Sequence, residues 1–505
     1  MKSACQLLVI GAGPAGMAVA QTAARQGVEV VVVDEQAHAG GQIYRNVNAS
    51  PLADIDLLGK DYVFGRQLVQ GFEHAHIDYF ANSGVWYLDR GGELGIVRDG
   101  VHHRVHAQRI VIACGAQERP MPFPGWDKAG VMTAGAAQIL MKSAAMVPAE
   151  APVLAGNGPL LLLLAWQYLR AGVKLRAIVD TAQSSNRWSA LRHFPQAITA
   201  SDYLFKGLKL VTAIRRARVP WLREASDLRA AGEERLTGLH FTSRGKPQYI
   251  ETSLLLLHQG VIPSLQIAAA AGCETLWNPL QQCWQPQVDD WGQSSVESIF
   301  VAGDAAGIGG ARAAWLGGQL TGLQVAHQLG LIEAAERDRL ARPVHKARAR
   351  HLAIRPFLDT WYRVAEASLV PRDETLACRC EEVSAGEIRA LAAMGCSGPN
   401  QAKAFTRCGM GPCQGRFCGS TVEQIFAHET AADPQQVGRF NTRPPLKPVT
   451  LGQLACTSHQ SSAADAAKRT VTGPTPDGPP QRLCNTHTTN IGEISRLANS
   501  EGESE

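Results

Sequence analysis

Four cysteines near the end of the chain have the residue type and spacing of a metal or cluster site. Cys378 and Cys380 form C-x-C, and Cys413 and Cys418 form C-x-x-x-x-C further along. Four thiolates gathered by a compact helical fold can hold a [2Fe–2S] cluster. Residues 385–394 form an amphipathic stretch between the two pairs and would supply such a fold. The sequence therefore predicts an iron–sulfur site with Cys378, Cys380, Cys413 and Cys418 as metal ligands.

Two other uses of these thiols are compatible with the residue types. Structural zinc usually takes C-x-x-C knuckles, a spacing that these cysteines lack. A redox disulfide between Cys413 and Cys418 is the other, but in disulfide reductases such a pair lies near the N-terminal flavin motif, where this sequence has none. Cys396 and Cys408 are near enough to be alternative ligands. Iron–sulfur chemistry is favoured, because the surrounding glycines leave backbone N–H groups free to bond cluster sulfurs.

The start of the chain carries a second group of residues with recognisable chemistry. Gly11, Gly13 and Gly16 have the spacing G-x-G-x-x-G, after the apolar run 7–10 and before an expected helix. The first glycine permits a tight turn, the second lets the backbone approach a pyrophosphate, and the third lets helix and strand pack closely. Pro14 suits the first helical turn, where a missing N–H costs little. The pattern predicts a dinucleotide site; a glycine turn that serves packing alone is the alternative.

The strand expected after this helix ends in acidic residues. Residues 28–33 are apolar except for Glu29, and Asp34 follows at the strand tip, where a carboxylate can accept hydrogen bonds from ribose hydroxyls. Further on, the turn at Gly41 and Gln42 offers amides to a phosphate or a flavin edge, with Arg45 beside it. An ordinary loop is the alternative for this turn.

Two later strand ends resemble flavoprotein motifs. Residues 109–115, RIVIACG, look like the ATG-type turn of flavoproteins with two dinucleotide-binding domains, with Cys114 where threonine is usual. Residues 299–304, IFVAGD, are similar to the strand whose aspartate, here Asp304, bonds the ribityl chain in that class. The helix after it would point its positive N-terminus at the isoalloxazine. The predicted FAD contacts are Gly11, Gly13, Pro14, Ala15, Gly16, Asp34, Glu35, Gly41, Gln42, Arg45, Gly115, Gly303 and Asp304.

The middle of the chain repeats the opening pattern. Residues 151–180 read as strand, glycine turn, helix and strand, with Gly156 and Gly158 in the turn and Asp180 at the second strand's tip. Leu161 replaces the third glycine, so we expect the helix to lie further from its strand. This second Rossmann-like domain either binds a nucleotide, NAD(P) or ATP, or is an empty scaffold.

The ordered set of motifs resembles one group of heteromeric oxidoreductases. The motifs are VIGAGPAG, VDEQ, GGQIYR, ERPMPFPGW, GVMTAGAAQ, VAGD, CRCEEV, GMGPCQGRFCG and RPPLKP. Over roughly residues 5–455 they are similar to the A (α) subunits of opine oxidases, the B subunit of hydrogen cyanide synthase, and the α subunits of D-hydroxyproline and proline dehydrogenases. The cysteine region resembles a bacterioferritin-associated-ferredoxin-like [2Fe–2S] domain. A small residue is usual there at the position of Cys408, so the resemblance implies the four ligands named first.

This resemblance implies a division of labour between subunits. Amine oxidation in such complexes occurs on a separate, flavin-bearing β subunit that is similar to D-amino-acid oxidase. The chain would then relay electrons from it to an acceptor, with a further flavin, FMN, at the interface. No convincing substrate pocket or catalytic residue is identified in this sequence. A self-sufficient NAD(P)H-dependent reductase is the alternative function, and Leu161 counts against it.

The expected fold class is α/β, with two Rossmann-like domains of the glutathione-reductase kind and a small helical [2Fe–2S] domain. The first domain must be discontinuous, because the strand before Asp304 returns to it. The expected parts are 1–145 with 290–335 (FAD domain), 146–289 (second Rossmann-like domain), 336–370 (basic helix and linker), 371–430 (cluster domain), 431–455 (an extension) and 456–505 (a disordered tail or arm).

Bulk composition excludes several function classes. The net charge of +4 over 505 residues gives no reason to expect nucleic-acid binding. The longest apolar run, residues 160–166, is far shorter than the ~20 residues that span a membrane. No secretory signal fits the first strand, so a cytoplasmic location is expected, with contact to the inner membrane only through the electron acceptor.

Overall fold

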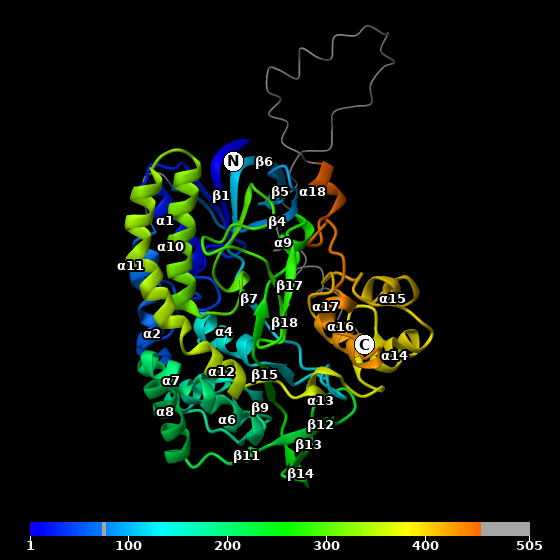
Figure 1. Cartoon of the computed structure of the whole chain (residues 1–505). Coiled ribbons are helices and arrows are strands. Elements are labelled where there is room, and N and C mark those ends of the chain that lie inside the picture. Colours follow the sequence, from blue (N-terminus) through cyan, green and yellow to red (C-terminus); the bar gives the residue numbers. More distant parts are fainter. Residues whose placement is uncertain (73–76, 456–505) are drawn as a thin grey trace, which may run out of the picture.

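The computed structural model describes residues 1–72 and 77–455. It contains two α/β units and a smaller helical unit carrying the cysteines, which lies at one side of the molecule (Figure 1). The expected fold class is confirmed. The tail predicted for residues 456–505 lies outside the described residues.

The first sheet carries the N-terminal glycine turn. Its core is parallel, with β1 between β2 and β6, and β19 also pairs with β6. Strand β6 is long enough to pair antiparallel with β5 in its first half and parallel with β1 in its second half. The strands are β1 (Ala4–Ile10), β2 (Val30–Val33), β3 (Ile77–Phe80), β4 (Ser83–Leu88), β5 (Glu93–Arg98), β6 (Val101–Ile112) and β19 (Ile299–Val301).

Two helices on this sheet pack with their backbones in close approach. They are α1 (Pro14–Arg25) and α10 (Ala311–Gln328), which lie side by side in Figure 1. A Cβ added at Gly318 would come within 2.3 Å of the Ala15 carbonyl oxygen, and one at Gly322 within 2.8 Å of that of Val19. Glycines in α10 therefore bring the returning segment onto the N-terminal helix, next to the strand β19 that pairs with β6.

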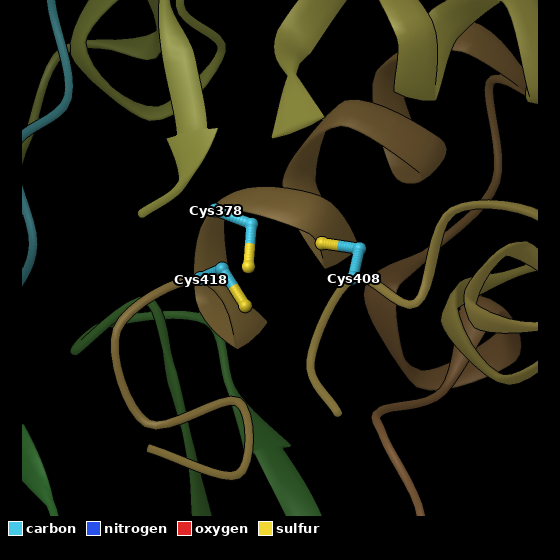
Figure 2. Close-up of side chains that lie close together, drawn as sticks. All are labelled: Cys378, Cys408 and Cys418. Carbon is cyan, nitrogen blue, oxygen red and sulfur yellow. The ribbon is translucent and has the colours of Figure 1, made fainter. Parts of the chain in front are cut away.

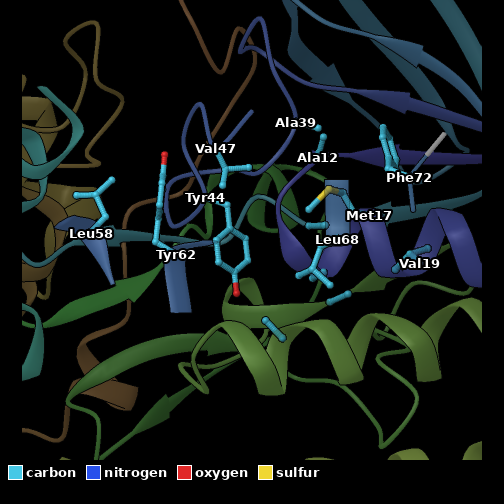
Figure 3. Close-up of a cluster of buried hydrophobic side chains, with 14 of the residues drawn as sticks. Ala12, Met17, Val19, Ala39, Tyr44, Val47, Leu58, Tyr62, Leu68 and Phe72 are labelled. Carbon is cyan, nitrogen blue, oxygen red and sulfur yellow. The ribbon is translucent and has the colours of Figure 1, made fainter. Parts of the chain in front are cut away.

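The outer face of α1 is covered by residues that follow the second strand. Tyr44, Tyr62, Leu68 and Phe72 belong to one buried cluster with Met17, and Figure 3 shows Leu68 next to Met17. Tyr62 and Leu68 lie in the short helices α2 (Lys60–Val63) and α3 (Gly65–Gln70). Burial of this apolar surface fixes the loop that contains the predicted cofactor contacts Gly41, Gln42 and Arg45.

The second sheet is fully parallel, with the order β11-β10-β9-β15-β8. Leu161 is buried in its helix, α5 (Pro159–Arg170), and is accommodated there. A Cβ at the matching Gly16 would instead lie 1.8 Å from the Gly11 carbonyl oxygen, so α5 lies further from its turn than α1 does, as expected. The strands are β8 (Val131–Thr133), β9 (Val153–Asn157), β10 (Ala177–Asp180), β11 (Trp221–Arg223) and β15 (Leu255–Gln259).

The boundary predicted at 145/146 is placed too late. Strand β8 and helix α4 (Ala134–Ala144) belong to the second unit, because β8 pairs with β15 and α4 packs on α5 and β15.

The second unit also carries α6 (Ser184–Ala190), α7 (Phe194–Ala197), α8 (Ser201–Arg216) and a β-meander of β12 (Ala225–Ala231), β13 (Gly238–Ser243) and β14 (Lys246–Glu251). The remaining pieces between the units are β7 (Ala116–Glu118), β16 (Val261–Pro263), α9 (Gln266–Ala270), β17 (Thr275–Asn278) and β18 (Cys283–Pro286).

The expected basic helix is present as α11 (Ala334–Leu352), which packs against α10. It leads through α12 (Arg355–Trp361) and α13 (Glu366–Leu369) into the cysteine unit. That unit contains β20 (Leu376–Cys378), β21 (Val383–Ser384), α14 (Ala385–Ala393), α15 (Pro399–Thr406), α16 (Gly419–Glu429) and α17 (Pro434–Val437).

The segment after α17 returns to the first sheet. The amide of Leu446 donates to the Trp86 carbonyl at 2.8 Å, and the chain ends its described part in α18 (Leu451–Ala455). Among the helices of the described ranges, none combines the length and apolarity needed to cross a membrane.

Candidate functional site

A cavity of about 2000 Å³ lies where the three units meet. Except for Gly16 and Gly303, all of the predicted FAD contacts line it. The predicted contacts in its wall are Gly11, Gly13, Pro14, Ala15, Asp34, Glu35, Gly41, Gln42, Arg45, Gly115 and Asp304. The fold therefore brings these residues, distant in sequence, to one place.

The glycine turn is built so that backbone can lie against a ligand. Gly11 has φ +104°, and a Cβ there would meet the Ala113 carbonyl oxygen at 2.6 Å. A Cβ at Gly41 would approach the Cα of Gly13 at 2.8 Å, so the two glycine loops touch. Helix α1 begins at Pro14 without a side-chain cap. Its unpaired N–H groups therefore face the cavity, as a pyrophosphate site requires.

The two acidic residues after β2 have different surroundings. One carboxylate oxygen of Asp34 accepts from the Ala12 amide at 2.6 Å, and the other accepts from the Gln36 amide at 2.7 Å. Burial raises the pKa of Asp34, and these two hydrogen bonds oppose the rise. Glu35 lines the cavity and pairs with Lys447 from the C-terminal segment. Asp34 therefore lies in the cavity wall with its carboxylate bonded to the backbone around the glycine turn, and Glu35 is a second carboxylate in the same wall.

Replacing Asp34 with alanine is expected to weaken FAD binding by about 2 kcal/mol, roughly 30-fold in Kd, because the Ala12 amide loses its charged acceptor. Fluorescence titration of flavin-depleted protein measures this. Asp180 is the matched control: its oxygens accept from the Ala182 amide and the Trp221 indole in the second sheet. We expect Asp180→Ala to leave the FAD Kd unchanged; equal losses in both variants would contradict the role given to Asp34.

Asp304 organises the turn before α10. Its Oδ1 accepts from the amides of Gly309 and Gly310, each at 2.9 Å. In the described part of the chain no protein donor bonds Oδ2, which is available to a ligand hydroxyl in the cavity. Helix α10 then starts without a side-chain cap, and its first residues line the cavity. The site offers glycine backbone, carboxylates and two helix N-termini without side-chain caps. These groups fit the pyrophosphate, ribose and ribityl groups of FAD.

The second glycine turn is only partly equipped for a nucleotide. Gly156 and Gly158 have φ of +126° and +110°, and the latter lines the cavity, whereas the Asp180 side chain is held by Trp221. Within the described ranges, neither polar atom of the buried Asn157 amide has a hydrogen-bond partner. This amide is the feature that favours a ligand at the second turn.

A carboxylate–imidazole pair that the sequence does not reveal lies beside this turn. Glu118 contacts His258 Nδ1 at 2.7 Å and also accepts from the Gly135 amide at 2.9 Å. His258 stands alone in the sequence, since its partner is distant along the chain. Both residues line the cavity between the two glycine turns.

The cysteines form one buried group and one neighbouring pair. The sulfurs of Cys378, Cys408 and Cys418 all lie within 4.8 Å of one another, and Figure 2 shows these side chains pointing toward each other. The thiols of Cys380 and Cys413 interact with one another, and Cys380 also lies near Cys378. Two of the four predicted ligands therefore lie in the buried group and two in the neighbouring pair, and the structure adds Cys408, which the resemblance leaves out of the ligand set.

The buried group stabilises a thiolate. Hydrogen bonds from Cys408 and then Cys418 lower the pKa of Cys378 to about 2, and the backbone amides of Gly409 and Glu381 act in the same direction. Thiolates are the form that binds metals. The donor set therefore fits a metal or an iron–sulfur cluster.

The cysteine loop forms part of the wall of the large cavity. Arg416 and Phe417, between Cys413 and Cys418, line it. Gln117 donates to the Arg416 carbonyl at 2.7 Å, and the Arg416 guanidinium donates to the Leu446 carbonyl at 2.6 Å. The cysteine loop is therefore hydrogen-bonded, in the cavity wall, to Gln117 of β7 and to the C-terminal segment.

The glycine turn, the acidic residues after β2 and the cavity between the two α/β units form a dinucleotide cradle, and the sequence comparisons identify the class of protein that carries it. Residues 5–330 match the pyridine nucleotide-disulphide oxidoreductase family, and residues 376–458 match the sarcosine oxidase A3 domain. The chain belongs to the pyridine nucleotide-disulphide oxidoreductase family. More narrowly, it belongs with the A subunits of opine oxidase.

The sequence relatives support both statements. The opine oxidase A subunit of Rhizobium meliloti is 43% identical over 93% of this chain and 90% of its own length, and that of Agrobacterium tumefaciens (strain Ach5) is 41% identical over 93% and 94%. The HcnB subunit of hydrogen cyanide synthase from Pseudomonas aeruginosa is 31% identical over 88% and 96%.

A solved structure confirms the fold. L-proline dehydrogenase from P. horikoshii superposes with a TM-score of 0.64, at 18% identity, over 89% of this chain and 79% of its own. The family and the cradle together support an FAD-dependent oxidoreductase subunit.

Proposed function

We propose that this chain is the electron-transferring α subunit of a heteromeric FAD-dependent dehydrogenase or oxidase acting on CH–NH donors. An opine or a related secondary or D-amino acid would be oxidised on a partner β subunit. The observation that carries the proposal is the shared wall: the loop between Cys413 and Cys418 borders the same cavity as the FAD cradle. The names of the relatives support the opine class.

The chain's own residues would hold two redox groups. FAD, when bound, supplies two-electron chemistry, and a [2Fe–2S] cluster supplies one-electron transfer. Asp34 keeps the glycine turn in shape, Glu35 would offer its carboxylate to the ribose, and the free oxygen of Asp304 would accept from the ribityl chain. Cys378, Cys380, Cys413 and Cys418 are the proposed cluster ligands.

The proposed partner is a flavin-bearing β subunit similar to D-amino-acid oxidase, with FMN at the interface and a separate electron acceptor. The relatives are named as subunits, which supports a heteromer. We place the complex in the cytoplasm, in contact with the inner membrane only through its acceptor.

Co-expression with a D-amino-acid-oxidase-like subunit tests this proposal. We expect the two chains to co-purify with FAD and with about two irons per α chain. Octopine, nopaline, D-hydroxyproline and glycine are then added without oxygen, and one of them should bleach the flavin of the complex but not of the isolated α chain. Bleaching of the isolated chain by a substrate would contradict the assignment of amine oxidation to the partner.

A second candidate is a self-sufficient NAD(P)H-dependent reductase. The unpaired amide of Asn157 at the second glycine turn favours it. NAD(P) or ATP would then occupy the second unit. Rapid bleaching of the isolated chain by NADH would support this function over the first.

A further inference from the structure

The thiol site contains more sulfurs than one cluster uses. A [2Fe–2S] cluster takes four cysteine ligands. Five cysteines converge here: the buried group of Cys378, Cys408 and Cys418, and the neighbouring pair of Cys380 and Cys413. If the pair serves one iron, three thiols remain for the two positions on the other. This argument rests on the proposed iron–sulfur function.

Cys408 is held toward the other sulfurs by a rigid turn. Arg407, which ends α15, has φ +58°, and Gly409 has φ +84°. The ring of Phe440 packs against Gly409, where a Cβ would approach it to 2.8 Å. Arg407 is also tied to Glu381 at 3.1 Å, next to Cys380. Two positive-φ residues thus flank Cys408 and fix its direction.

Cys408 is as deeply buried as Cys378 and Cys418, the two cysteines nearest to its sulfur. The exposed fractions are 1% for Cys378, 0% for Cys408 and 1% for Cys418, and Figure 2 shows the three side chains converging from separate segments. A buried cysteine is often no more than a small apolar side chain. Here its sulfur lies within 4.8 Å of two others that belong to the proposed ligand set. That is within reach of one shared metal.

We propose that Cys408 is a fifth, exchangeable ligand of the cluster. Cys408 can take the position of Cys378 or Cys418. The iron bound by the buried group then keeps two thiolate ligands when Cys378 or Cys418 is removed. The neighbouring pair, Cys380 and Cys413, has no alternative ligand of this kind, because no sixth cysteine among the described residues joins these five.

Alanine variants of the anaerobically purified full chain test this proposal, since alanine supplies no oxygen ligand. Iron and acid-labile sulfide per chain, visible absorbance, and the electron paramagnetic resonance signal after dithionite reduction are measured. FAD content and circular dichroism report folding. Cys408→Ala and Cys418→Ala are each expected to keep at least half of the wild-type iron. The iron content of the double variant Cys408→Ala/Cys418→Ala should be at least tenfold lower than that of the wild type.

The matched control removes one thiol from the neighbouring pair of Cys380 and Cys413. Cys413→Ala should lose the cluster although Cys408 is intact, while FAD is kept. If Cys418→Ala fails to fold, Cys378→Ala makes the same test, because Cys408 and Cys418 then remain. Loss of the cluster from folded Cys418→Ala or Cys378→Ala would overturn the proposal, and so would a double variant that keeps its iron. Wild-type protein without iron and sulfide would overturn the cluster itself, an outcome distinct from failure of the exchange.

Discussion

Replacing Gly16 with alanine is expected to abolish FAD retention through gel filtration. A Cβ there would lie 1.8 Å from the Gly11 carbonyl oxygen, inside the glycine turn. Helix α1 cannot simply move away, because α10 is packed on its other side through Gly318 and Gly322. Overpacking of this kind costs about 3 kcal/mol or more, and here it is concentrated at the phosphate-facing turn. Flavin absorbance per chain and chemical unfolding measure the two effects.

Gly207→Ala is the matched control for that substitution. Gly207 lies within helix α8, has ordinary helical backbone, and a Cβ there meets no atom within 4 Å. Alanine is favoured over glycine inside helices by about 1 kcal/mol. Gly207→Ala should therefore keep its flavin and gain a little stability. Normal FAD content in Gly16→Ala would refute the close packing of turn and helix.

The glycine turn was predictable from sequence because its geometry is local. Gly11 and Gly16 are required by contacts within the first strand, turn and helix and by the adjoining strand end at Ala113. The role of Asp34 was not predictable to the same degree. A carboxylate at a strand tip can accept from a ribose or from backbone, and only the fold shows that Ala12 and Gln36 donate to it.

The boundary between the two α/β units depends on a contact that local sequence does not reveal. Strand β8 has only three residues, too few to show a period, and it joins the second sheet by pairing with β15 far along the chain. The Glu118–His258 pair and the Lys447–Glu35 pair are hidden for the same reason. Each joins segments whose proximity is set by packing.

Cys408 shows why spacing alone cannot rank ligands. Five cysteines occur between residues 378 and 418 in addition to Cys396, and spacing treats them alike. The left-handed turn at Arg407 and Gly409 directs Cys408 inward, whereas Cys396 is buried elsewhere in the same core. Backbone conformation, which the spacing does not encode, makes the difference.

Lys142 is expected to make stability depend on pH. Its Nζ donates to the carbonyls of Gln42 and Ile43, at 3.2 and 3.0 Å, and to the Gln138 side chain at 2.8 Å. It thereby ties α4 of the second unit to the predicted FAD loop. Burial, and then the nearby charge of Arg45, lower the pKa of Lys142 from 10.5 to about 7. Between these values the unfolded chain binds the proton that the folded chain has lost.

The free energy of unfolding should therefore rise as pH increases from about 7 toward 10.5, with a slope of at most about 1.4 kcal/mol per pH unit, and this lysine should add no pH dependence well below 7. Lys142→Met removes this proton linkage, so the wild type should gain about 2 kcal/mol relative to the variant between pH 7 and 9. Urea unfolding at both pH values measures the difference. Lys346→Met, on the exposed face of α11, is the control and should keep the wild-type slope. Parallel pH profiles for wild type and Lys142→Met would show that the lysine stays charged, held by its three acceptors.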